Sequence, residues 1–82
     1  MKRENIILDI DAQDRLGLLA QILNLIADAK INVKAINTSD KKGNIRISIS
    51  LESSDTENIK SISEKIGKIQ SILNVGFHHK KE

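Results

Sequence analysis

The sequence of 82 residues contains no cysteine, and Phe77 is its one aromatic residue. Without cysteine the chain offers no disulfide framework, no thiolate nucleophile and no zinc–thiolate site. The scarcity of aromatic rings argues against recognition of single-stranded nucleic acid, since that binding depends on bases stacking on aromatic side chains. No apolar run approaches the ~20 residues of a membrane span, and Asp9 and Asp11 interrupt the stretch that a signal peptide would need unbroken. We therefore expect a soluble, cytoplasmic domain without a membrane or nucleic-acid partner.

The charge is nearly balanced, because 13 basic and 11 acidic residues give a formal net charge of +2. Basic residues occur in pairs at 2–3, 41–42 and 80–81, where we expect the termini and a turn. No basic stripe of the kind that neutralises many phosphates is visible. A chain of this length forms one domain, with its core at residues 5–78, and buries ~60–65% of its unfolded surface, so its stability margin is thin.

The spacing of apolar residues predicts the element order β-α-β-β-α-β. Residues 16–30 carry apolar side chains at helical spacing, and a second helix begins at 53–55, where Asp55 or Ser54 is expected to cap it. Two β-α-β units around a hairpin at 40–44 predict an α+β, ferredoxin-like βαββαβ sandwich, in which both helices cover one face of a four-stranded antiparallel sheet. The alternating segments expected as strands are 6–12, 31–38, 45–52 and 72–78.

The same alternation predicts which side chains face the helices. In the second strand these are Ile31, Val33 and Ala35, and in the last strand Leu73, Val75 and Phe77. The open face of the sheet is then predicted to carry Asp9, Asp11, Lys34, Ile36, Thr38, Arg46, Ser48, Ser50, Asn74 and His78.

The apolar stripe of the first helix is wider than packing on its own sheet requires. At one edge of the stripe, Leu18 and Leu25 are expected to contact either a second subunit or the edge of the core under a loop. With two apolar residues predicted on the polar side of their strands, the candidates for a dimer interface are Ile7, Leu18, Leu25 and Ile36. Within the second helix, Gly67 is expected to weaken the helix by ~1 kcal/mol relative to alanine.

The turn from Asp14 to Leu19 is the segment that most favours a small-molecule site. Asp14 is expected to cap the first helix, and Gly17 lets a ligand or a backbone approach closely. The free N–H groups at a helix N-terminus suit a carboxylate or a phosphate. The alternative is a purely structural turn, in which Asp14 caps the helix, Gly17 packs on the sheet and the two leucines enter the core.

Other chemistry is sparse, and we expect no catalytic residues, no metal and no cofactor. Asp9 and Asp11 share one face of a strand, but two carboxylates are too few ligands for calcium. His78 and His79 point to opposite faces of a strand end. The sequence has no P-loop, no serine elbow motif and no Rossmann glycine triplet.

With these residues in place, the chain resembles an ACT domain over nearly its whole length. The resemblance lies in the turn Asp14-Arg15-Leu16-Gly17-Leu18-Leu19 together with Ile31-Asn32-Val33 at the start of the second strand. Asn37-Thr38, followed by a strand rich in isoleucine, is similar to the C-terminal ACT domain of RelA/SpoT-type GTP pyrophosphokinases. The chain is therefore identified as a member of this family, expected to be a fragment from the C-terminus of a larger protein.

The resemblance implies regulation rather than catalysis: a homodimer that binds a small amino acid at the subunit interface and acts on other domains of a stringent-response (p)ppGpp synthetase-hydrolase. A backbone N–H near Gly17 would hold the α-carboxylate, and Asp11 would hold the α-ammonium group. Alternatives are a ligand-independent interaction or dimerisation module and a regulatory domain of another enzyme of amino-acid metabolism. A third is an RNA-contacting domain, although the lack of aromatic residues argues against it. The residues that the resemblance places at the ligand are Asp11, Asp14, Arg15, Gly17, Leu18 and Leu19, with Asn32 and Val33 from a second subunit.

Overall fold

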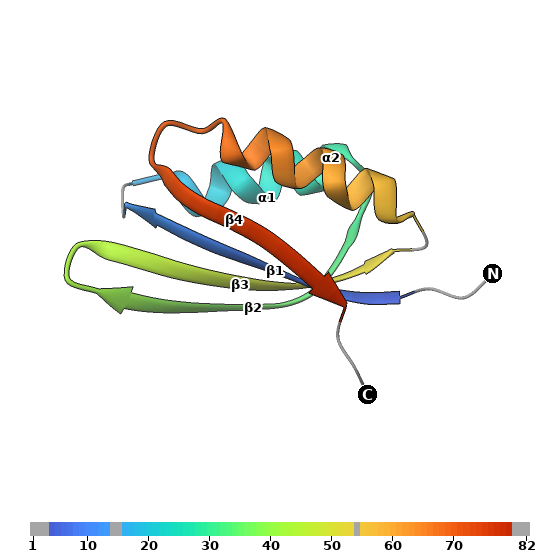
Figure 1. Cartoon of the computed structure of the whole chain (residues 1–82), viewed down its shortest axis with the longest axis horizontal. Helices are drawn as coiled ribbons and strands as arrows, with labels where there is room; N and C mark the ends of the chain where they lie inside the picture. The colour runs from blue at the N-terminus through green and yellow to red at the C-terminus, as the bar shows by residue number, and fades with distance from the viewer. Residues whose placement is uncertain (1–3, 14–15, 54, 80–82) are drawn as a thin grey trace.

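The structure, a computed structural model, describes residues 4–13, 16–53 and 55–79, and its elements follow the predicted order (Figure 1). Four strands form one antiparallel sheet in the order β2-β3-β1-β4, which confirms the ferredoxin-like βαββαβ fold. The two helices lie together on one side of this sheet (Figure 1). The elements are β1 (Glu4–Gln13), α1 (Leu18–Asp28), β2 (Asn32–Lys41), β3 (Asn44–Ser53), α2 (Thr56–Gly67) and β4 (Ile72–His79).

The core lies between the helices and the two central strands, β1 and β3. Alternate residues of these strands, such as Leu8 and Ile49, are fully buried, as the period-two pattern predicts. They pack against the apolar stripes of α1 and α2, which include Ile22 and Ile62. The core contains many β-branched isoleucines, which suit a pleated surface that is covered on one side.

A register shift in β2 reverses the predicted faces of that strand. Between Val33 and Ala35 the pairing with β3 slips by one residue, so Ala35 lies opposite Ser50 on the open face. Ile36 and Thr38 lie opposite Ile49 and Ile47, on the face toward the helices. Their prediction for the open face is therefore wrong, as is that of Ala35 for the helix side, because one extra residue moves all later side chains to the other face.

A second register shift corrects the start of β4. Asn74 pairs with Asp11 and Ile72 pairs with Ala12, so Leu73 is the extra residue. Ile72 packs against the core, whereas Leu73 is 56% exposed. The prediction that Leu73 faces the helices is wrong, although Val75 and Phe77 pack against the core as predicted.

The two helix starts differ in how well the sequence predicts them. Asp55 caps α2 as predicted, since its carboxylate accepts from the backbone N–H groups of Glu57 and Asn58 at 3.1 and 3.2 Å. The helix α1 begins at Leu18 with Gly17 at the N-cap position, so the predicted cap by Asp14 is wrong, and Asp14 lies outside the described residues.

Gly67 serves the packing of α2 rather than interrupting the helix. It is the last residue of α2, where a helix-weakening residue costs little. A Cβ atom at this position would lie 3.2 Å from Val75 Cγ1, so glycine allows the end of α2 to approach β4 closely.

Candidate functional site

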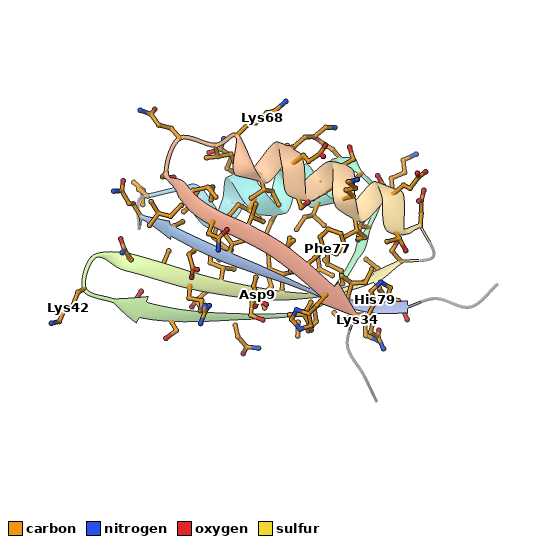
Figure 2. All side chains as sticks on the ribbon, in the orientation of Figure 1. Asp9, Lys34, Lys42, Lys68, Phe77 and His79 are labelled. Carbon is orange, nitrogen blue, oxygen red and sulfur yellow. The ribbon has the colours of Figure 1, made fainter. Side chains whose placement is uncertain are left out.

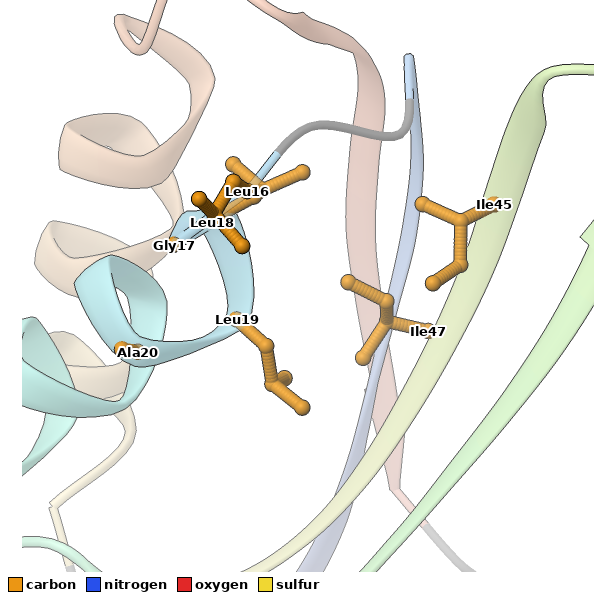
Figure 3. A pocket seen from close by; sticks show the side chains of 7 residues that line it. All are labelled: Leu16, Gly17, Leu18, Leu19, Ala20, Ile45 and Ile47. Atoms are coloured by element: carbon orange, nitrogen blue, oxygen red, sulfur yellow. The ribbon is translucent and has the colours of Figure 1, made fainter.

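The turn between β1 and α1 lines a cavity of about 630 Å³ that extends to β3 (Figure 3). One wall is the start of α1, and the other consists of Ile45 and Ile47 on β3. Leu19 and Ile47 point into the same space from opposite walls (Figure 3). The side chains that line the cavity are aliphatic, and the residues are Leu16, Gly17, Leu18, Leu19, Ala20, Ile45 and Ile47.

Gly17 sets the direction in which the chain enters α1. Its φ of +83° belongs to the left-handed region, which costs residues with a Cβ atom ~1–2 kcal/mol. A Cβ atom there would meet nothing within 4 Å, so the backbone conformation, not lack of space, favours glycine. The Gly17 carbonyl accepts from the Gln21 N–H at 3.0 Å, which is the first hydrogen bond of the helix.

The N-terminus of α1 borders the cavity. The first N–H groups of a helix have no intrahelical acceptor, and they carry the positive end of the helix dipole. Gly17 has no side chain to accept from them, and the first turn of α1 contains no acidic residue. The cavity therefore combines hydrogen-bond donors suited to a carboxylate with an aliphatic wall.

Three of the residues predicted at the ligand, Gly17, Leu18 and Leu19, line this cavity together. Asp14 and Arg15 lie outside the described residues. The sequence interpretation missed four lining residues. Leu16 belongs to the turn motif itself and could have been included, whereas the approach of β3 to the turn has no signal in the sequence. The residues missed are Leu16, Ala20, Ile45 and Ile47.

Asp11, Asn32 and Val33 do not meet this cavity within one chain. Asp11 lies on the open face, where Arg46 Nε approaches Asp11 Oδ1 at 3.2 Å. Asn32 and Val33 lie at the far end of β3 from the cavity, opposite Glu52 and Leu51. The side-chain amide of Asn32 also donates a hydrogen bond from Nδ2 to Glu52 Oε1 at 3.2 Å.

The four residues predicted for a dimer interface do not form one surface. Leu18 is 2% exposed, so it belongs to the core and the cavity wall. Ile7 is half-buried on the open face, opposite Ser50. Leu25 is half-buried in a groove between the helices, and Ile36 is 36% exposed on the edge strand β2.

Exposed pairs of charged or titratable side chains lie on the open face. Besides Asp11 and Arg46, His78 Nδ1 lies 3.4 Å from Asp9 Oδ2. In the described part of the chain, no three His, Cys, Asp or Glu residues gather closely enough to hold a metal ion. The described helices are also too short and too polar for any of them to cross a membrane.

Comparison with known proteins yields one family. A model of the ACT domain matches residues 5–76. A curated ACT domain-containing protein of Caldicellulosiruptor saccharolyticus is 31% identical over 72 residues, which are 85% of this chain and 48% of that protein. The chain thus spans about half the length of the curated relative that it matches.

Solved structures with low sequence identity share the fold. The ACT domain from GTP pyrophosphokinase of Chlorobium tepidum has a TM-score of 0.81 at 19% identity, over 94% of this chain and 100% of that chain. A homoserine dehydrogenase from Thiobacillus denitrificans has a TM-score of 0.82 at 23% identity, over 95% of this chain and 17% of that chain.

Proposed function

This chain belongs to the ACT domain family, and we propose that it regulates a larger protein by binding a small aliphatic amino acid in the cavity beside Gly17. ACT domains are regulatory rather than catalytic. The observation that carries the proposal is the cavity itself, which places the N-terminus of α1 beside an aliphatic wall. The α-carboxylate would accept from the N–H groups near Leu18, and the side chain would contact Leu19, Ile45 and Ile47.

A second copy of the chain is the proposed cover of the cavity. Leu16, at its rim, is fully exposed, and β2 is an edge strand that can pair with another strand. If two β2 strands pair antiparallel about Asn37, Ile36 of one copy lies opposite Thr38 of the other, and both residues are on the cavity side of the sheet.

This pairing would also bring Asn32 and Val33 of the second copy to the cavity. Asp40 pairs with Ile45, so the end of β2 that carries Asp40 is the end beside the cavity. The bulge keeps Val33 on the helix side of β2, and antiparallel pairing about Asn37 would bring Val33 of the second copy near Asp40, two strand spacings of ~4.8 Å from the cavity wall. The residues that the family resemblance assigns to a second subunit would then complete the site.

We propose that the Asp40 carboxylate, rather than that of Asp11, binds the α-ammonium group of the amino-acid ligand. Because directly paired residues share a face, Asp40 lies on the cavity side with Ile45, whereas Asp11 lies on the other face.

Replacing Asp40 with asparagine should weaken amino-acid binding roughly tenfold or more, since hydrogen bonds to charged groups contribute ~1.5–3 kcal/mol. Asp11→Asn removes the same charge at the same end of the sheet and should leave the affinity unchanged. Titration calorimetry compares them, and a loss confined to Asp11→Asn would contradict the assignment.

The direct test of the proposed function is a thermal-shift screen of the chain against the proteinogenic amino acids. A ligand at ~100 times its Kd stabilises a domain by ~2.7 kcal/mol, and for this size each kcal/mol raises the Tm by ~4–8 °C. Valine, leucine or isoleucine should give the largest rise, because the wall is aliphatic. If no amino acid raises the Tm at millimolar concentration, the sensor function fails.

We propose a RelA/SpoT-type (p)ppGpp synthetase-hydrolase as the larger protein, with this chain as its C-terminal domain. The support is the turn motif at 14–19, the segment 31–33 and the fold shared with the ACT domain of the Chlorobium GTP pyrophosphokinase. The fold shared with a homoserine dehydrogenase supports the alternative, a regulatory domain of another enzyme of amino-acid metabolism. The full reading frame of the gene decides between them, because only the first places a pyrophosphokinase domain on the same polypeptide.

A further inference from the structure

A groove between the two helices forms a second concave surface, separate from the cavity beside Gly17. It is a shallow, open groove of about 480 Å³ and shares no lining residue with that cavity. It lies where the middle of α1 passes the end of α2, and Lys68 projects from this side of the molecule, away from the sheet (Figure 2). The lining residues are Gln21, Leu25, Lys65, Lys68, Ile69 and Gln70.

The groove has an apolar floor and a basic rim. Leu25 and Ile69 are half-buried and pack against the core, so their remaining exposed surface forms the floor. Lys65 and Lys68 are exposed and three residues apart, which brings their side chains to one side of the helix end. Neither ammonium group forms an ion pair with a residue in the described ranges, and no acidic residue lines the groove.

Stability of the helix accounts for the position of both lysines but not for the exposed aliphatic surface beside them. Lys65 lies in the last turn of α2, where a positive charge interacts favourably with the helix dipole. Lys68 follows the helix as its C-cap residue, where the same interaction with the helix dipole applies. An aliphatic floor beside two cations matches a ligand that carries both an aliphatic group and negative charge.

We propose that this groove docks an acidic segment of another polypeptide, which places an aliphatic side chain on Leu25 and Ile69 and carboxylates near Lys65 and Lys68. A second copy of this chain does not fit, because a two-fold interface sets a patch against itself and would bring four lysines together. RNA fits poorly, because the groove offers no aromatic ring on which a base could stack. The inference is independent of amino-acid binding, which uses the other cavity.

The test uses two synthetic helical peptides of about four turns, one of Glu, Ala and Leu and one in which Lys replaces every Glu. Titrated into the ¹⁵N,¹³C-labelled chain, the acidic peptide should bind and shift the methyl signals of Leu25 and Ile69, while those of Ile45 and Ile47 stay unchanged. The double variant K65Q/K68Q should lose at least tenfold in affinity. The matched control is K42Q/K60Q, which removes the same two charges from exposed positions outside the groove.

Three results would overturn the proposal. One is equal binding of the lysine peptide, and another is an affinity loss as large in K42Q/K60Q as in K65Q/K68Q. The third is an oligouridylate that binds more tightly than the acidic peptide and shifts the same methyl signals. If the Tm of both double variants is unchanged, any loss of binding results from the removed surface charges and not from unfolding.

Discussion

Replacing Leu8 with alanine should remove ~2–5 kcal/mol from the free energy of unfolding, through lost burial and the cavity left behind. Leu8 is 0% exposed in β1, between Ile49 of β3 and Phe77 of β4, so three strands and the helices surround it. A domain of this length has a total stability of ~4–12 kcal/mol. The variant should therefore lose much of its stability, which urea denaturation followed by circular dichroism measures.

Ile7→Ala is the matched control one residue earlier in the same strand. Ile7 is half-buried on the open face, opposite Ser50. Its truncation should lower the free energy of unfolding by less than ~1 kcal/mol, because this side chain buries little apolar surface. Costs of equal size at the two positions would contradict the assignment of Ile7 to an uncovered face.

The alternation of apolar residues is sufficient to predict the sheet wherever the strands stay regular. Buried residues alternate along β1 from Ile6 to Ala12 and along β3 from Ile47 to Leu51. Asp55 stands before α2 with the side chain that caps a helix. The pattern fails where an extra residue enters a strand, at Lys34 in β2 and at Leu73 in β4. Nothing local marks these bulges, because they depend on how neighbouring strands pair, so the later residues of β2 were assigned to the wrong face.

The residues of the candidate site are likewise predictable from the sequence only in part. Gly17 and the two leucines after it are recognisable from the turn motif, whereas the left-handed conformation of Gly17 at the N-cap position is seen only in the structure. Ile45 and Ile47 alternate with Arg46 and Ser48, which are predicted on the open face, but the approach of α1 to β3 is a property of the tertiary fold. Asp11 was assigned to the ligand by its position in the motif, and pairing with β3 places it on the other face with Arg46.

Replacing Ile45 with glutamate should abolish amino-acid binding in the cavity. Ile45 is half-buried in the wall that faces the N-terminus of α1, so the new carboxylate would compete with the ligand's carboxylate for the helix N–H groups. It would also repel the ligand, since like charges across a binding surface cost several kcal/mol. We expect affinity for leucine, valine and isoleucine to fall at least a hundredfold, equivalent to ~2.7 kcal/mol, as measured by titration calorimetry.

Ile7→Glu provides the control, because it makes the same substitution at another half-buried isoleucine, on the opposite face of the sheet. Both variants gain one negative charge, so any effect of net charge on the ligand is the same in the two. Binding that survives in Ile7→Glu and disappears in Ile45→Glu places the amino acid between α1 and β3. Binding that survives in a folded Ile45→Glu variant, or that is lost in Ile7→Glu alone, would place the ligand on the open face instead, where Asp11 and Arg46 lie.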